Sequence, residues 1–445
     1  MLDQSFSADN FRHIIDLENR KGVHVEDKLS MDTIRKINER IRDVNALISS
    51  AKKRNDIPTL KILYESKKAL RDQKDTELSF DLEQISQRIA SPSFKIELKK
   101  VIIPDSKPIY TTSNIPEYFF TLKQIQRNVS KLFGVKQASR YSIIDQVKIL
   151  IGDQFPKYIL RTDIKDFYEN IDHKRLLDLI NKDNLLSPFS RNILRSILNE
   201  YKLKSGSNKG IPRGIGVSAY LAELYMRDVD KDIKDLDGVT YYARYVDDIL
   251  IIFTPTPSNS RRDYLQEVKE IVESKYNTNL NPIKTKPFDL VSTNQAFELE
   301  YLGYRFFFGL DRVETRMTDK KVDKYKKRIK LAFDHYNNFS KVNEKKARDL
   351  IVKRIRFLCG NTRLTNNKKN ILVGIYYSNS QLTLLDDLKR LDSSLIQNIK
   401  LKINNPNLKD RLRKYGFEKG FINKSYSPFN TKQLSEIMAV WENPF

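Results

Sequence analysis

The chain has 445 residues, more than one ordinary domain holds, so several subdomains are expected. Its 80 Lys and Arg residues against 57 Asp and Glu give a net charge of +23, which favours a polyanionic partner because binding phosphates releases counterions. No apolar run is long enough to span a bilayer and residues 1–4 do not open a signal peptide, which argues against a membrane or secreted protein.

The first 90 residues are predicted to be helical. Apolar residues recur there at spacings of three and four and make one stripe, formed by Ile34, Ile37, Ile41, Val44 and Ile48. A second helix is predicted after Pro58, from Leu60, Leu63 and Leu70. We expect an antiparallel helical pair; a coiled coil that binds a partner is the alternative, although the heptad pattern is short.

Residues 91–157 are predicted to contain a helix over 122–129, with cations before and after it. Lys100, Lys107 and Arg140 are among these cations. An isolated cation is more often a solvated surface charge.

A short apolar strand over 158–163 ends in an acid, Asp163. A second acid and aromatic residues follow it, and Tyr168 lies five positions after Asp163. Helices are predicted near 173–183 and 188–201. A Gly/Pro turn over 210–214 then leads into a helix over 216–235, with Ser218 near its start.

Two adjacent acids, Asp247 and Asp248, lie inside a run of β-forming residues over 241–253. The pattern predicts a hairpin whose tight turn carries both carboxylates. Two negative charges at such a short separation repel each other, and burying either carboxylate costs the free energy of its hydration. A divalent cation would offset both the repulsion and this cost. Asp163 can face the same point, although a plain polar turn is the alternative for this segment alone.

Carboxylate oxygens are hard ligands that suit Mg²⁺, with Mn²⁺ as a substitute. The four histidines and one cysteine are too few for a zinc-based account. The single cysteine, Cys359, cannot form an internal disulfide, which favours a reducing cytoplasm.

A loop over 255–260, another helix, and strands near 298–314 are predicted next. After Thr315 the sequence predicts a helix capped by Thr318 or Asp319 and rich in cations, among them Lys320, Lys324, Lys327 and Arg328. Such a helix can grip nucleic acid through phosphates, and a surface helix made soluble by lysine is the alternative. The remaining residues are predicted to be basic and mostly helical, with their aromatic residues in a small core.

The segments around Asp163, over 210–223 and over 241–253 resemble, in this order, motifs A, B and C of the reverse transcriptase palm. Residues 280–286 resemble motif D, and residues 300–304 resemble motif E, the primer grip. The resemblance covers roughly residues 95–310. It implies an α+β right-hand fold: an N-terminal helical region over 1–90, fingers over 91–157, a palm with an antiparallel sheet and helices over 158–314, and a basic helical thumb with a C-terminal extension over 315–445.

The resemblance also implies roles for individual residues. Asp163, Asp247 and Asp248 would be catalytic and would hold two Mg²⁺ ions, with the Ile164 carbonyl as a further ligand. Tyr168 would be the steric gate that excludes a 2′-hydroxyl, where an aromatic core residue is the alternative. Leu302 and Gly303 would form the primer grip. Contacts to the nucleotide are expected from Lys284 and Arg213, and from Lys100, Lys107 and Arg140 in place of the usual Lys–Arg pair.

One departure from the family pattern lies in motif B, where Arg213 occupies the position of a common glutamine. A guanidinium there could touch template, nucleotide or a carboxylate. This turn and the opening segments 4–11 and 16–22 are most similar to bacterial defence-associated reverse transcriptases, within which the chain resembles the A-type subunit of the type 3 system. That resemblance implies an anti-phage role, a noncoding RNA as template or scaffold, a second reverse transcriptase subunit and a higher oligomer.

The leading hypothesis is an RNA-directed DNA polymerase that takes an RNA template and deoxynucleotides and releases a DNA product. A template-independent or protein-primed polymerase is the second hypothesis. The third is a catalytically silent RNA-binding scaffold, against which the intact set of three acids argues.

Overall fold

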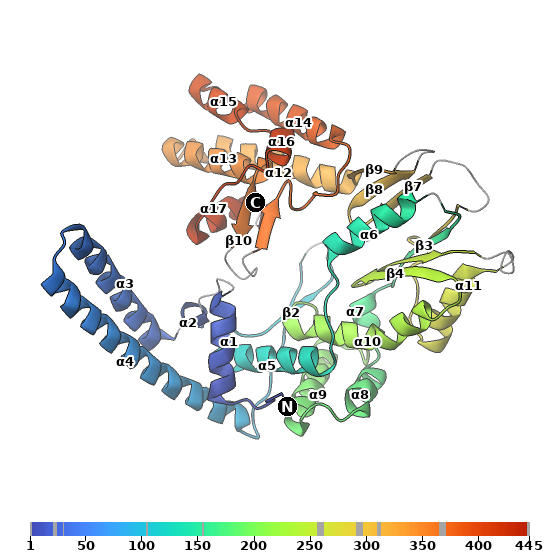
Figure 1. The fold of residues 1–445 in the computed structure, drawn as a ribbon, viewed down its shortest axis with the longest axis horizontal. Helices are drawn as coiled ribbons and strands as arrows, with labels where there is room; N and C mark the ends of the chain where they lie inside the picture. Colours follow the sequence, from blue (N-terminus) through green and yellow to red (C-terminus); the bar gives the residue numbers. More distant parts are fainter. Residues whose placement is uncertain are drawn as a thin grey trace. The chain divides into compact units, whose positions relative to one another are not determined.

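The computed structural model describes residues 2–20, 25–29, 31–103, 106–153, 155–255, 262–290, 297–308, 313–364 and 371–442. Helices predominate, and the strands form small sheets (Figure 1). The chain divides into two compact units. Unit 1 contains Met1–Ala138 and Ile159–Pro287, and unit 2 contains Ser139–Tyr158 and Phe288–Phe445. Within the described ranges, no helix combines the length and apolar character needed to cross a bilayer.

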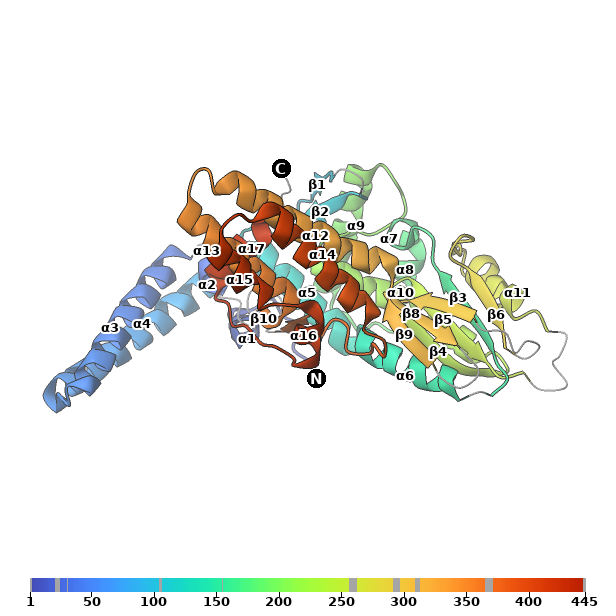
Figure 2. The ribbon, with the colours of Figure 1, turned by 90° about the horizontal axis from the view of Figure 1, so that it is seen from above.

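The N-terminal part of unit 1 consists of helices α1 (Ala8–Arg20), α2 (Val25–Lys28), α3 (Asp32–Lys53) and α4 (Ile57–Ala90). Helices α3 and α4 run side by side in both views, which confirms the predicted helical pair (Figures 1 and 2). Ile34, Ile37 and Ile48 of the predicted stripe are buried. The second helix begins at Ile57, where the Asp56 side chain caps it by accepting from the Thr59 amide.

The rest of unit 1 alternates helices with short strands. In chain order these are β1 (Lys99–Val101), β2 (Ile109–Thr111), α5 (Pro116–Leu132), β3 (Tyr158–Asp163), α7 (Phe167–Asn170), α8 (His173–Lys182), α9 (Pro188–Ser205), α10 (Gly216–Lys234), β4 (Val239–Tyr245), β5 (Asp248–Phe253), α11 (Tyr264–Lys269), a π-helical turn over Glu270–Lys275, and β6 (Lys286–Asp289). Strands β1 and β2 form an antiparallel hairpin.

A four-stranded sheet, in the order β4–β5–β3–β6, positions the acidic residues. Strand β5 is central, and its residues 249–253 are all buried, as expected for a strand covered on both faces. Strands β4 and β5 pair antiparallel and are joined by a tight turn, which confirms the predicted hairpin. Most of the predicted loop after it, residues 256–260, lies outside the described residues.

Unit 2 contains α6 (Arg140–Gly152), which packs on the antiparallel sheet β7 (Phe297–Tyr301), β8 (Tyr304–Phe308) and β9 (Val313–Met317). Beyond the sheet come α12 (Asp319–Phe339), α13 (Glu344–Cys359), β10 (Asn361–Leu364), β11 (Ile371–Gly374), α14 (Asp386–Lys402), α15 (Pro406–Arg413), α16 (Phe417–Ile422) and α17 (Thr431–Glu442). Helix α12 packs against α13 and α14, and the three helices lie together in the view from above (Figure 2).

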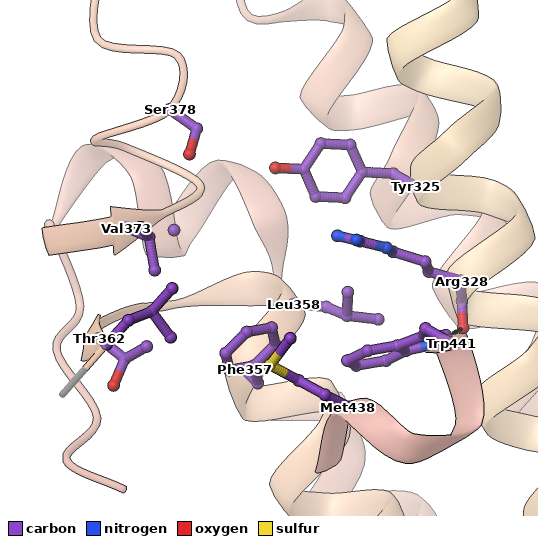
Figure 3. Close-up of a pocket in the computed structure, with 11 residues that line it drawn as sticks. Tyr325, Arg328, Phe357, Leu358, Thr362, Val373, Ser378, Met438 and Trp441 are labelled. Carbon is purple, nitrogen blue, oxygen red and sulfur yellow. Dashed lines mark hydrogen bonds between the residues drawn. The ribbon is translucent and has the colours of Figure 1, made fainter. Parts of the chain in front are cut away.

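The cation-rich helix predicted after residue 315 is α12. Thr318 is its N-cap residue, although its side chain makes no capping bond. Lys320, Lys324 and Lys327 are exposed, whereas the guanidinium of Arg328 lies over the Trp441 ring, 5.5 Å from its centroid. Arg328 and Trp441 also line a pocket of about 350 Å³ between α12, α13 and α17 (Figure 3). Phe417, Phe421 and Phe429 are buried, as expected for a small aromatic core, whereas Tyr426 is exposed.

Candidate active site

The hairpin turn between β4 and β5 carries the two adjacent acids. Tyr245 pairs with Asp248, so Val246 and Asp247 are the two central turn residues. Val246 has a φ of +63°, in the left-handed region that a β-branched residue rarely adopts. Strain of this kind costs about 1–3 kcal/mol and persists only where the surrounding structure imposes it.

A backbone hydrogen bond joins this turn to the end of β3. The Ile164 amide donates to the Asp247 carbonyl oxygen at 3.1 Å, directly after Asp163, the last residue of the strand. Asp163 is 3% exposed. The structure thus brings Asp163 close to the adjacent pair Asp247 and Asp248, which begins 84 positions later in the chain (247 − 163).

Burial and mutual repulsion govern the charge of these carboxylates. Burial raises the pKa of Asp247, and the neighbouring charges of Asp163 and Asp248 raise it further. Burial also raises the pKa of Asp248, with Asp163 adding to the effect and Arg161 opposing it. A bound cation close to Asp247 and Asp248 would lower both pKa values and so favour the ionised form of both acids.

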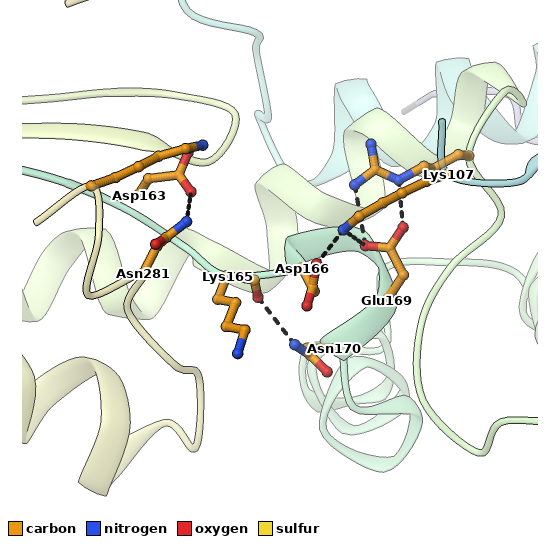
Figure 4. A network of polar contacts seen from close by, with 9 residues as sticks. Lys107, Asp163, Lys165, Asp166, Glu169, Asn170 and Asn281 are labelled. Atoms are coloured by element: carbon orange, nitrogen blue, oxygen red, sulfur yellow. Dashed lines mark hydrogen bonds and ion pairs between the residues drawn. The ribbon is translucent and has the colours of Figure 1, made fainter. Parts of the chain in front are cut away.

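Two cations of the chain itself pair with this acidic group. Lys284 Nζ lies 2.8 Å from Asp163 Oδ2, and Arg161 Nη2 lies 2.8 Å from Asp248 Oδ1. Asn281 Nδ2 donates to Asp163 Oδ1 at 3.4 Å (Figure 4). The structure therefore places Lys284, which the sequence predicted to contact nucleotide, on a carboxylate of the acidic group.

The acidic group offers oxygen atoms of the type that a hard divalent cation binds. They are carboxylate oxygens, with the Ile164 carbonyl on the adjoining backbone, and such oxygens are the ligands that Mg²⁺ takes. Among the residues that the structure describes, no three His, Cys, Asp or Glu side chains are arranged to hold a metal ion. In this structure Asp163 is paired with Lys284 and Asp248 with Arg161.

Arg244, on β4, holds the turn between β4 and β5 through a hydrogen bond, and the sequence analysis did not identify it. Its side chain is 4% exposed and forms ion pairs with Glu223 and Asp230 of α10, each at 2.7 Å. Its Nη1 also donates to the Val246 carbonyl oxygen at 2.9 Å. An arginine within an otherwise apolar strand was the available signal, because a buried charge requires partners.

A second polar network surrounds Tyr168 on α7. Arg213 donates to both carboxylate oxygens of Glu169, from Nε at 2.6 Å and from Nη2 at 3.1 Å. Its guanidinium lies 4.9 Å from the centroid of the Tyr168 ring. Lys107 lies between Asp166 and Glu169 and pairs with both, at 3.1 Å from Glu169 (Figure 4). Of the three targets considered for Arg213, the one it contacts is a carboxylate.

Lys100 and Arg140, the other residues predicted to contact the nucleotide, have no contact with the Tyr168 network in the interactions described above. Lys100 is exposed on β1. Arg140 belongs to unit 2, where its Nε donates to the Leu302 carbonyl oxygen at 2.9 Å and its guanidinium lies 5.4 Å from the Tyr304 ring centroid. Leu302 and Gly303 form the turn between β7 and β8, with φ values of +46° and +77°.

Comparison with known proteins identifies the family. The sequence profile described as reverse transcriptase (RNA-dependent DNA polymerase) matches residues 28–306, more than half of the chain. A search of curated proteins finds no match.

Two telomerase structures are among the solved structures that resemble the chain. One is apo telomerase from Candida tropicalis, truncated from the C-terminal domain, with 14% identity over 52% of this chain and 56% of that one, at a TM-score of 0.38. The other is Candida albicans telomerase with a fragment of telomeric RNA, with 11% identity over 80% and 64%, at a TM-score of 0.36. The chain covers less than two thirds of either telomerase chain.

Proposed function

Because the chain belongs to the reverse transcriptase family, a family of RNA-directed DNA polymerases with an α+β fold, we propose that it copies RNA into DNA at Asp163, Asp247 and Asp248 with two bound Mg²⁺ ions. The observation that supports the proposal is that these three acids lie at neighbouring ends of the inner strands β3 and β5, with Lys284 and Arg161 paired to them. Mn²⁺ would be an alternative ion, since its ligand preferences are similar.

The reaction forms one bond and breaks another at the α-phosphorus of a deoxynucleoside triphosphate. The primer 3′-oxygen attacks this phosphorus after losing its proton, and pyrophosphate leaves. Two divalent ions, when bound, would activate the hydroxyl and stabilise the charge that develops on the leaving group. Asp163, Asp247 and Asp248 would hold these ions, and the Ile164 carbonyl would add a ligand.

The surrounding residues would orient the substrates. Tyr168 would stand beneath the sugar and exclude a 2′-hydroxyl, so deoxynucleotides would be preferred. Lys284 would move from Asp163 to the triphosphate when metal binds, because the same carboxylate would then face a stronger cation. Lys100 and Lys107 are the further proposed contacts of the triphosphate, and Arg213 would act on the nucleotide through the Tyr168 ring that its guanidinium contacts.

We extend the proposal to the domains. The fingers would span 91–157, the palm 158–314, and the thumb with its extension 315–445, after an N-terminal helical region over 1–90. The two positive φ values at Leu302 and Gly303 support a primer-grip turn, whose Leu302 carbonyl oxygen accepts a hydrogen bond from Arg140. Arg140 stays a proposed contact of the nucleotide. The exposed Lys320, Lys324 and Lys327 of α12 suit contact with nucleic-acid phosphates, with Arg328 beside them.

A primer-extension assay tests the polymerase proposal. The double variant Asp247→Asn and Asp248→Asn should incorporate no labelled deoxynucleotide on a primed RNA template, while its melting temperature and RNA binding persist. The control is Asp178→Asn, the same change at an exposed position on α8, which should leave incorporation intact. Incorporation by the double variant would refute the site.

The same assay separates the competing functions. Incorporation that does not depend on added RNA indicates template-independent synthesis, and label attached covalently to the protein indicates protein priming. RNA binding by a wild-type protein that incorporates nothing indicates a scaffold.

We also propose a role in bacterial anti-phage defence with a noncoding RNA, a partner reverse transcriptase and a higher oligomer. The support is the resemblance of segments 4–11 and 16–22 and of the Arg213 turn to the A-type subunit of the type 3 system. Purification with bound nucleic acid, followed by sequencing of that RNA, tests the proposed template. Phage plating on cells that carry the locus with and without the Asp247→Asn change tests the role: equal plating would contradict it.

A further inference from the structure

Three charged side chains, Arg213, Glu169 and Lys107, form a hydrogen-bonded network beside the Tyr168 ring. We infer that Glu169, to which the sequence analysis gave no role, is a positioning residue for sugar selection: it holds Arg213 against the Tyr168 ring and so fixes the gate. This inference rests on the proposed function of Tyr168.

The local backbone alone is a weak support for the ring. Tyr168 lies on α7, a helix of four residues that follows Asp166 in the left-handed conformation at φ +49°. Helices this short are marginal without tertiary contacts. The Tyr168 ring instead contacts two neighbours, the buried Phe167 ring at 5.6 Å between centroids and the Arg213 guanidinium at 4.9 Å from its centroid.

Glu169 restricts the orientation of the Arg213 side chain. Two parallel hydrogen bonds, at 2.6 and 3.1 Å, hold the planar guanidinium in one orientation, as a single bond could not. Burial opposes ionisation of Glu169, but the bonds from Arg213 and Lys107 prevail and hold its pKa below the ordinary value. The carboxylate is therefore charged at neutral pH, and the bidentate pair persists.

The backbone of the motif B turn is held independently of these side chains. The Ile211 amide donates to the Tyr168 carbonyl at 2.8 Å, and the Tyr110 amide donates to the Arg213 carbonyl at 2.6 Å. Gly214, at φ +106°, lies so close to β2 that an added Cβ would be 2.6 Å from the Tyr110 carbonyl oxygen. Changes in the side chains of Glu169 or Arg213 should therefore leave the turn in place.

The network is close to the acidic group. The charge of Asp247 acts on both the Tyr168 hydroxyl and the Arg213 guanidinium. Arg213 Nε and Nη2 both donate to Glu169. This geometry favours a role of Arg213 in holding the Tyr168 ring over a direct contact with the triphosphate. The two roles predict different kinetics.

The test compares kcat/KM for a deoxynucleotide and for the matching ribonucleotide on a primed RNA template. The variants are Glu169→Gln, Arg213→Lys, Tyr168→Ala and the double variant Glu169→Gln with Tyr168→Ala. Glu83→Gln, the same change on an exposed position of α4, is the control and should leave the ratio unchanged. Melting curves establish that each variant is folded.

If Glu169 acts through the ring, the ratio of deoxynucleotide to ribonucleotide use should fall on the order of tenfold in Glu169→Gln, since small displacements of a pocket wall change discrimination by about 10- to 200-fold. Arg213→Lys should lower it as well. The double variant should match Tyr168→Ala alone, because the residue through which Glu169 acts is then gone.

Three results would overturn the inference. One is an equal rise in KM for both nucleotides at an unchanged ratio, which indicates triphosphate binding. The second is an additive effect in the double variant. The third is complete loss of incorporation by folded Glu169→Gln, which indicates an essential role in the chemistry. A wild-type protein that incorporates nothing would instead refute the proposed function.

Discussion

Replacing Arg244 by methionine should both destabilise unit 1 and lower its activity. The five N–H groups of this guanidinium make five hydrogen bonds, two to Glu223, two to Asp230 and one to the Val246 carbonyl. The two carboxylates are only 14% and 18% exposed, so their charges lose most of their compensation when the arginine is removed. Breaking a buried pair by removing one partner costs about 3–5 kcal/mol.

A matched series separates this electrostatic cost from the support of the turn. Adding Glu223→Gln and Asp230→Asn to Arg244→Met removes the uncompensated charges, so most of the lost free energy of unfolding should return. Activity should stay low, because the bond to the Val246 carbonyl is still absent and the turn that carries Asp247 is less constrained. Arg227→Met on α10 is the control, since an exposed ion pair contributes about 0–1 kcal/mol.

Urea denaturation followed by circular dichroism gives the free energy of unfolding, and primer extension gives the activity. The reasoning is wrong if Arg244→Met costs less than about 1 kcal/mol, or if the triple variant is no more stable than the single one.

Three further changes probe separate parts of the chain. Tyr168→Ala should raise ribonucleotide incorporation about 10- to 200-fold while Tyr168→Phe keeps discrimination, and equal ribonucleotide use by both would remove the ring as a gate. Burial and the nearby Arg140 lower the pKa of Lys321 to about 7. The unfolded chain then binds more protons between pH 7 and 10.5, so stability should rise with pH across this range. Lys321→Met should raise the melting temperature at pH 7 and flatten this rise; an identical pH profile would contradict it. Val246→Gly should relieve backbone strain and stabilise the fold by about 0.5–1 kcal/mol, yet lower activity, and a less stable variant would contradict the assignment of strain.

The sequence was most informative where local pattern and local structure coincide. The strand before Asp163, the hairpin around Asp247 and the helix that follows the Gly/Pro turn all form where periodicity and turn residues predicted them. The N-terminal helical pair was predictable for the same reason, since an apolar stripe at helical spacing requires a neighbouring surface.

Pairing across long separations could not be predicted in this way. Glu169 and Arg213 are 44 positions apart, and Asp163 and Lys284 are 121 apart, so no local pattern joins them. Strands β1 and β2 have three residues each, too few for an alternation to be recognised. The hydrogen bond from Arg140 to the Leu302 carbonyl oxygen joins residues 162 positions apart, so the sequence could show the charge but not this partner.

The pairing of Lys284 and Arg161 with the proposed catalytic acids has a consequence for how the proposed metal centre would assemble. A cage of bare carboxylates would need its ions in order to fold, as many small zinc domains do. Here internal counterions already offset part of the repulsion, so under the proposed function the scaffold can fold first and bind magnesium afterwards. Removing divalent ions with a chelator should then abolish nucleotide incorporation reversibly, without unfolding the protein.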